Sequence, residues 1–292
     1  MFYSGRQWSK DVLFNMYAIV TGGTRSLGYC VAEELAKDGY THIILTYNSN
    51  TERAEKSKKA LEENYGISVF LAKGDLAQPE AVDAIFDCVE KNFGNKLNAL
   101  VSNAGAVVGV TSTPESEAAK KAAGSYHKTI GSGEFDDFSA YDYLQDIYPK
   151  CFIRLVERSI KIMEDGKGYI LAVSAPGANI TATASNVAYA VPNLAKGGLE
   201  LLVRYYARAL APRGITVNAV VPNFIMSESW HHLTASMGGV ESDATKAMIQ
   251  ETPMKRFGEG REFAHVVSFL CSPKASFITG VSLPVDGGFH LK

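Results

Sequence analysis

The sequence predicts a single α/β domain in which a doubly wound parallel sheet is covered by helices on both faces. Short β-branched runs alternate with helical patterns of about 12 residues, which is the order of βαβ units. A glycine-rich turn joins the first predicted strand to the first predicted helix. The chain has 292 residues, 46% of them hydrophobic and 21% charged, so it can bury a large core.

The first part of the chain contains four predicted strands, each a short apolar run rich in β-branched residues. They are residues 17–21, 42–47, 67–72 and 97–102. A helix is predicted after each of the first three strands; the first has apolar residues at helical spacing and ends at Gly39, and the second is highly charged. These helices are residues 27–37, 51–65 and 79–93.

The alternation resumes in the second part of the chain with three more predicted strands. They are residues 169–173, 215–220 and 281–285. The helices are predicted at 141–163, from near Val191 to about 211, and at 262–271, and a loop at 224–251 contains a short helical segment. No repeat or linker divides the chain, so residues 16–292 are predicted to form one domain.

Two segments lie outside this pattern. Residues 1–15 are predicted to be an N-terminal arm, because they lack the continuous apolar run and cleavage site of a secretory signal. Residues 106–140 are polar and rich in Ser, Gly and Ala, which predicts a surface insertion. Long loops of this kind are often functional, so a substrate lid and an inert excursion both stay open.

Composition excludes several classes of function. The net charge of −2 and the absence of a long basic run argue against nucleic-acid binding. No run approaches the ~18 apolar residues of a membrane span. The four cysteines form no CxxC pair and lie beside no histidine cluster, so no metal site is expected. We expect the cysteines to be reduced thiols in a cytoplasmic protein.

The glycine-rich turn reads TGGTRSLG at residues 21–28, directly between a strand and a helix. Glycines let the backbone approach a pyrophosphate, whose charge is favoured by the N–H groups of a helix N-terminus. This context predicts a dinucleotide site in a Rossmann-type sheet. Its predicted cofactor-binding residues are Gly22, Thr24, Arg25, Ser26 and Leu27.

The residues after the second strand indicate which nicotinamide cofactor is bound. An acidic residue at this position would accept hydrogen bonds from the ribose of NAD. Here the sequence is YNSN at 47–50, with no carboxylate. Asn48, Ser49 and the nearby Arg25 leave room and positive charge for a 2′-phosphate, which favours NADP(H). Asp75 and Leu76, after the third strand, are expected beside the adenine.

These motifs resemble those of the short-chain dehydrogenase/reductase family over about residues 16–289. The turn is similar to the family's TGxxxGxG, with Ser26 in place of the middle glycine, and SNAG at 102–105 is similar to its NNAG. RGITVN at 213–218, VPNFI at 221–225 and the TG…VDGG segment at 279–288 also resemble family motifs.

The resemblance implies a doubly wound fold, a bound nicotinamide cofactor and a small-molecule substrate. It also implies a homodimer or homotetramer built through the two long central helices. Six further cofactor-binding residues follow from the matching motifs. They are Asn103, Ala104, Gly105, Pro222, Ile225 and Ser227.

The catalytic segment departs from the family pattern. Members of the family typically use a serine and a tyrosine that precedes a lysine by four residues, one helical turn. Lys196 matches the lysine, which would also bind the nicotinamide ribose, but Pro192 stands at the tyrosine position. Ala175 occupies the usual serine position, with Ser174 one step earlier. The family's supporting asparagine falls near Tyr148.

An offshoot of the family, the enoyl reductases, has its tyrosine seven residues before the lysine. Tyr189 has this spacing from Lys196, two helical turns. The predicted catalytic residues are therefore Tyr189, Lys196 and Ser174.

Two functions from different classes follow. The first is an NADPH-dependent oxidoreductase, enoyl- or 3-oxoacyl-reductase-like, that reduces a C=O, C=C or C=N bond of a small or acyl-type substrate with a non-standard proton donor. An iminium substrate would need no proton donor. The alternative is a redox-inactive protein that acts as a cofactor-binding scaffold or non-redox cyclase, which Pro192 and Ala175 favour.

Overall fold

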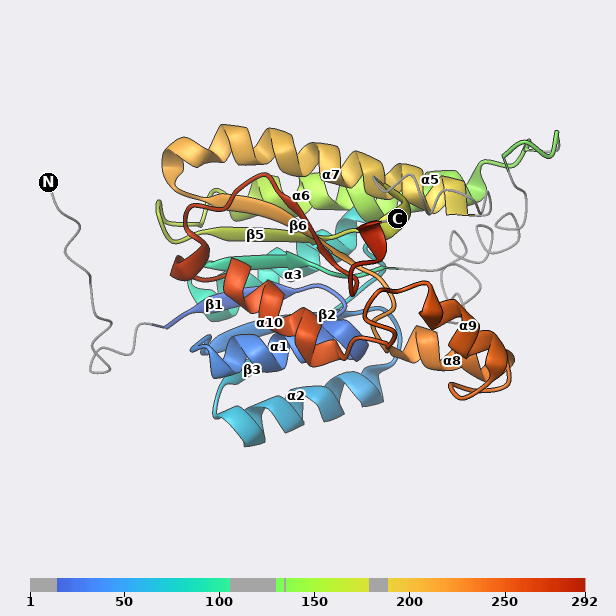
Figure 1. Ribbon diagram of the computed structural model, residues 1–292. Coiled ribbons are helices and arrows are strands. Elements are labelled where there is room, and N and C mark those ends of the chain that lie inside the picture. The colour runs from blue at the N-terminus through green and yellow to red at the C-terminus, as the bar shows by residue number, and fades with distance from the viewer. Residues whose placement is uncertain (1–14, 106–129, 134, 179–188, 292) are drawn as a thin grey trace, which may run out of the picture.

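The computed structural model describes residues 15–105, 130–133, 135–178 and 189–291. These residues form a seven-stranded sheet in the order β3-β2-β1-β4-β5-β6-β7, and every neighbouring pair is parallel (Figure 1). The predicted doubly wound fold is therefore confirmed. The arm at 1–15, apart from its last residue, and most of the insertion at 106–140 lie outside the described residues.

The seven strands lie within two residues of the predicted runs at either end. They are β1 (Tyr17–Val20), β2 (His42–Tyr47), β3 (Ser68–Lys73), β4 (Ala99–Ser102), β5 (Tyr169–Val173), β6 (Thr216–Pro222) and β7 (Ser282–Val285). Strand residues alternate between the two faces of the sheet because successive side chains point in opposite directions. Ile19 and Ile44 thus face one buried cluster, whereas Val20 and Leu45 face the other.

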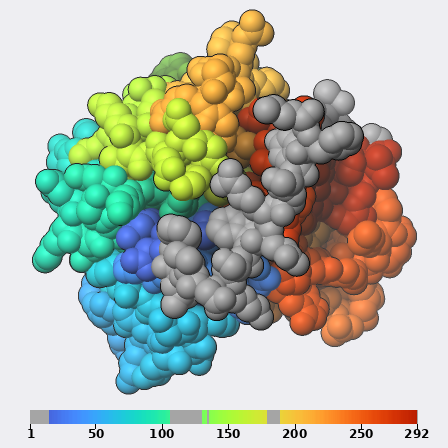
Figure 2. Space-filling view, turned by 90° about the vertical axis from the view of Figure 1, so that its left-hand side faces the viewer, coloured from blue at the N-terminus to red at the C-terminus, as the bar shows by residue number. Residues whose placement is uncertain are grey.

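Helices cover both faces of the sheet. One face is covered by α1 (Ser26–Lys37), α2 (Thr51–Tyr65) and α10 (Gly260–Leu270), the other by α3 (Pro79–Phe93), α6 (Cys151–Ser159) and α7 (Ala190–Leu210). Figure 2 shows the light-blue surface of α2 and the orange surface of α7 at opposite ends of the view. None of the helices in the described ranges combines the length and the hydropathy of a membrane-spanning segment.

The helix predicted at 141–163 is different in the structure. It consists of α5 (Ser139–Gln145), a π-helical turn η1 (Asp146–Lys150) and α6, which ends at Ser159. Pro149 lies inside the π-helical turn. Proline has no N–H to donate to the preceding turn and its ring crowds that turn, so the regular hydrogen-bond ladder is interrupted here.

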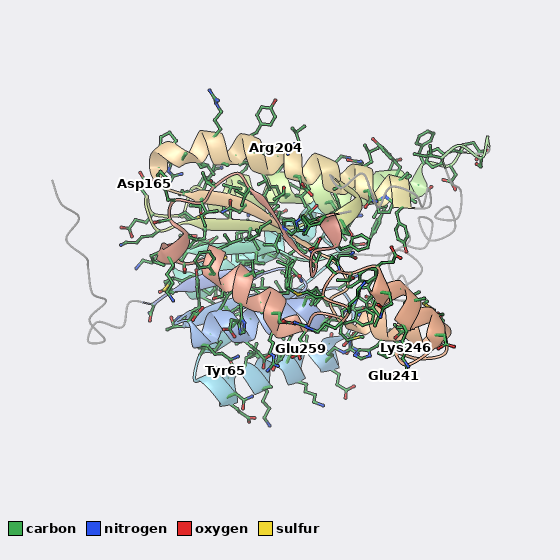
Figure 3. All side chains as sticks on the ribbon, viewed as in Figure 1. Tyr65, Asp165, Arg204, Glu241, Lys246 and Glu259 are labelled. Atoms are coloured by element: carbon green, nitrogen blue, oxygen red, sulfur yellow. The ribbon has the colours of Figure 1, made fainter. Side chains whose placement is uncertain are left out.

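The segment predicted as a loop with one short helix contains two helices, α8 (Glu228–Ser236) and α9 (Asp243–Gln250). Each begins after a serine whose hydroxyl accepts a hydrogen bond from a backbone N–H of the first turn. Ser227 accepts from Trp230 and Ser242 from Thr245. These caps satisfy orphan donors at each helix start. Figure 3 labels Glu241 and Lys246, an ion pair at the second of these helices.

Candidate nucleotide-binding and catalytic site

A cleft of about 1220 Å³ lies at the carboxyl ends of the strands. The order of the sheet reverses between β1 and β4, and ligands of doubly wound folds bind at such a switch point. All the residues predicted for the site line this one cleft. They are Gly22, Thr24, Arg25, Ser26, Leu27, Asn48, Ser49, Asp75, Leu76, Asn103, Ala104, Gly105, Ser174, Tyr189, Lys196, Pro222, Ile225 and Ser227.

A hydrogen-bonded junction connects the ends of β1 and β4 at the switch point. The Thr21 hydroxyl oxygen accepts hydrogen bonds from the backbone N–H groups of Asn103, at 2.9 Å, and Ala104, at 2.8 Å. The Asn103 amide in turn donates to the Thr21 carbonyl at 2.9 Å. The junction sets the position of the glycine-rich turn relative to residues 103–105, so the two parts of the cofactor motif come together.

The glycine-rich turn has the backbone that its motif requires. Gly22 has φ +63° and Ser26 has φ +51°, both in the left-handed region. Ser26 therefore adopts, at some cost, the conformation that glycine adopts readily. A Cβ atom at Gly28 would lie 2.3 Å from the Gly22 carbonyl oxygen and 2.6 Å from the Asn103 amide nitrogen. The helix N-terminus therefore packs directly against the turn, which suits it to hold a pyrophosphate.

Two arginines share one carboxylate at the edge of the cleft. Glu228, in the first turn of α8, has its Oε2 atom 3.3 Å from Arg25 Nη1 and 2.9 Å from Arg53 Nη1. The sequence analysis identified Arg25 but missed Arg53 and Glu228. Arg53 follows the N-cap residue Asn50 of α2, but nothing in the sequence indicates that α8 reaches the same place.

Lys196 has the most strongly shifted pKa of the basic side chains that line the cleft. Its side chain is buried, and its Nζ atom donates a hydrogen bond of 2.7 Å to the Val173 carbonyl. The same atom lies 3.7 Å from the centre of the Tyr148 ring. Burial lowers the pKa of Lys196 to about 7, and nearby Glu200 acts in the opposite direction. A lysine with this pKa exchanges its proton near neutral pH, as acid–base chemistry requires.

Glu200 is a buried carboxylate beneath the cleft that the sequence analysis missed. Only 2% of the residue is exposed, and its two oxygens accept hydrogen bonds from the Ser174 hydroxyl, at 2.5 Å, and the Ser282 hydroxyl, at 2.7 Å. Its place four residues after Lys196, on the same helix face, is the sequence signal that could have identified it. The two serines hydrogen-bond a charge that burial would otherwise penalise.

The three predicted catalytic residues lie in the same cleft but in different environments. Ser174 is buried, and its hydroxyl donates a hydrogen bond to Glu200. Tyr189 is 47% exposed and is the N-cap residue of α7, which starts within one residue of the predicted position. Pro192 and Ala175 also line the cleft, so the departure from the family pattern falls at the site itself.

Aromatic side chains surround the cleft near α8. The Phe224 ring contacts the rings of Trp230, Phe257 and Phe289 at centroid distances of 5.2 to 6.1 Å. Phe224, Trp230 and Phe289 line the cleft. This side of the cleft therefore offers flat apolar surface to a ligand.

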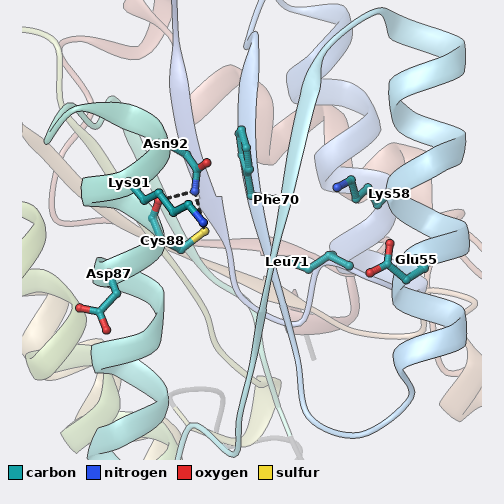
Figure 4. A pocket seen from close by; sticks show the side chains of 8 residues that line it. All are labelled: Glu55, Lys58, Phe70, Leu71, Asp87, Cys88, Lys91 and Asn92. Atoms are coloured by element: carbon teal, nitrogen blue, oxygen red, sulfur yellow. Dashed lines mark hydrogen bonds between the residues drawn. The ribbon is translucent and has the colours of Figure 1, made fainter.

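A second pocket lies between α2 and α3, beside β3, and has a volume of about 450 Å³ (Figure 4). The Asn92 amide there donates hydrogen bonds to the carbonyl oxygen and the sulfur of Cys88. All four cysteines of the chain are free. Among the described residues, no group of His, Cys, Asp or Glu side chains is arranged to hold a metal ion.

The closeness of Gly28 to the turn predicts the effect of a single methyl group. Gly28→Ala places a Cβ atom against the Gly22 carbonyl, so the turn must move and nucleotide binding is lost. Gly198→Ala is the control, because its nearest neighbour beyond the helix is 4.0 Å away. Fluorescence titration with NADPH measures both variants, and Gly28→Ala binding with the affinity of the native protein would contradict the prediction.

Comparison with known proteins identifies the family. The profile of the family described as enoyl-(acyl carrier protein) reductase matches residues 22–290. The 3-oxoacyl-[acyl-carrier-protein] reductase of Staphylococcus epidermidis is 30% identical, over 95% of this chain and 100% of that protein. A tropinone reductase homolog of Arabidopsis thaliana is 31% identical, over 97% of this chain and 81% of that protein.

Comparison with solved structures points to the same family. A short-chain dehydrogenase/reductase from Serratia marcescens superposes with a TM-score of 0.76 and 28% identity, over 95% of this chain and 99% of that one. A blue fluorescent protein from a metagenomic library, in complex with NADPH, has a TM-score of 0.76 and 26% identity, over 95% and 98%. With the switch-point cleft and the glycine-rich turn, these similarities show that the chain belongs to the short-chain dehydrogenase/reductase family of oxidoreductases.

Proposed function

We propose that the protein is an NADPH-dependent reductase of a C=O, C=C or C=N bond in a small or acyl-type substrate. The observation that carries this proposal is the buried Lys196, which lies in the same cleft as the glycine-rich turn and the other cofactor motifs. The related 3-oxoacyl-[acyl-carrier-protein] reductase and tropinone reductase homolog support a reductase.

The chain's residues suit a nicotinamide dinucleotide. The N-terminus of α1 and the turn at residues 21–28 would hold the pyrophosphate, because no side chain at Gly28 blocks the approach. Arg25 and Arg53 would bind the 2′-phosphate of NADP(H), with Asn48 and Ser49 alongside. Asp75 and Leu76 would lie against the adenine. The NADPH bound by the metagenomic relative supports this choice of cofactor.

The arginine pair predicts a preference for NADPH over NADH. Arg25→Met and Arg53→Met each remove a charged hydrogen bond to the 2′-phosphate, so each reduces the ratio of the NADH and NADPH dissociation constants about tenfold. Glu228→Gln is the control of opposite sign, since it removes the competing carboxylate and tightens NADPH binding. Native protein that binds NADH as tightly as NADPH would contradict the proposed binding of the 2′-phosphate by the two arginines.

The chemistry needs little from the protein beyond binding, orientation and a proton. A bound nicotinamide cofactor supplies the hydride. For a carbonyl substrate, the Tyr189 hydroxyl would donate its proton to the oxygen as the carbon is reduced, and water would restore that proton because Tyr189 is half exposed. Lys196 would bind the nicotinamide ribose. Ser174 connects the floor of the cleft to Glu200, whose negative charge favours the protonated lysine.

A substrate panel tests the proposal. NADPH oxidation is followed with ketones, enoyl thioesters and imines. With a ketone substrate, Tyr189→Phe should reduce kcat about 10²- to 10⁴-fold without changing the Kd for NADPH, because only the proton is lost. A Tyr189→Phe protein with full activity would remove Tyr189 from the mechanism.

Tight NADPH binding without turnover of any compound in the panel would contradict the reductase. It would support the second candidate, a redox-inactive scaffold or non-redox cyclase. Pro192 and Ala175 favour that candidate, because they line the cleft where the family has its tyrosine and serine.

We also propose that the protein forms a homodimer or homotetramer through α6 and α7. Apolar side chains on these helices are exposed in the single chain: Leu201 is 48% exposed, Tyr205 67% and Ile153 38%. The double change Leu201→Glu and Tyr205→Glu should convert the oligomer to monomers in sedimentation velocity. Native protein that sediments as a monomer would disprove this arrangement.

A further inference from the structure

We propose that Tyr148 is a positioning residue whose ring face holds the ammonium group of Lys196 in the cofactor cleft. The inference rests on the proposed role of Lys196 in binding the cofactor ribose. It adds a residue that acts through the lysine and not through a hydroxyl group.

The geometry is that of a cation–π contact inside the protein. The Nζ atom of Lys196 lies 3.7 Å from the ring centre of Tyr148, well within the range of about 6 Å at which such contacts are attractive. The lysine is only 8% exposed and the tyrosine only 6%. Because water is largely excluded, the attraction between the ammonium and the ring is stronger than at a surface.

The backbone around Tyr148 is adapted to this position. Tyr148 lies in the π-helical turn η1, directly before Pro149, and such turns are frequent at functional sites. Gly105 provides the space for the side chain: a Cβ atom at residue 105 would lie 3.2 Å from the Tyr148 hydroxyl oxygen. The glycine of the SNAG motif and the tyrosine of the π-helical turn are therefore complementary in shape.

The other groups around the amine explain why a ring is useful here. The Val173 carbonyl of β5 accepts one hydrogen bond from Nζ. Glu200, on the lysine's own helix, raises the pKa of Lys196 against the larger lowering effect of burial. The ring attracts the charged form of the Lys196 amine. Because it occupies only one side of Nζ, the remaining ammonium protons can point at a ligand.

The role of the ring is tested by lowering the electron density of its face while its shape stays nearly the same. Tyr148 is replaced by phenylalanine and then by phenylalanines with one, two and three fluorine atoms, each of which weakens the attraction for a cation. The pKa of Lys196 is measured without cofactor, from the pH dependence of its acylation rate by mass spectrometry. The NADPH dissociation constant is measured in parallel by fluorescence.

Phenylalanine should preserve both values. With each added fluorine the lysine pKa should fall and NADPH binding should weaken, by about tenfold over the series. The same fluorinated residues at Phe152, which is fully buried in α6 and does not line the cleft, serve as the control and should leave both values unchanged.

A lysine pKa that is constant across the Tyr148 series would overturn the inference, as would a loss of NADPH binding in Tyr148→Phe, which keeps the ring. A pKa that falls while NADPH binding stays constant would support the contact. The same result would contradict the proposed role of Lys196 at the ribose. The experiment therefore distinguishes failure of the Tyr148 contact from failure of the ribose-binding role.

Discussion

Burial of the Lys196 amine is the constraint around which the cleft is arranged. Removing a charged amine from water costs several kcal/mol, and the protein offsets this cost from three directions. The Val173 carbonyl accepts a hydrogen bond, the Tyr148 ring faces the charge, and Glu200 lies one helical turn away. Because burial is the larger effect, the lysine pKa falls to about 7 and the amine exchanges its proton under neutral conditions.

These contacts connect elements that are far apart in the sequence. Glu200 also accepts hydrogen bonds from Ser174 after β5 and Ser282 in β7, so one carboxylate joins α7 to two separate strands. At the other end of the cleft, Glu228 brings α8 against Arg25 and Arg53. The cleft thus has the buried Lys196 at one end, above the buried carboxylate of Glu200, and the more exposed Arg25 and Arg53 at the other.

The parallel sheet and the glycine-rich turn of the site could be predicted from local sequence patterns. The alternation of apolar runs and helical periodicity predicts the parallel sheet, because each strand must bury both faces and each helix only one. The glycine-rich turn predicts the cofactor site for a similar reason, since its backbone geometry belongs to contiguous residues. The π-helical turn at Asp146–Lys150 was missed, because helical periodicity does not distinguish it from a continuous α-helix.

By itself, the sequence determined the fold class, the order of the seven strands and many of the residues that line the cleft. These follow from hydrophobic periodicity and turn chemistry, which act over a few neighbouring residues. Only the tertiary structure decided what surrounds Lys196, that Glu200 accepts a hydrogen bond from the Ser174 hydroxyl, and that Glu228 pairs with Arg53. Those contacts join residues up to 175 positions apart, and their energies depend on burial and distance, which exist only once the chain has folded.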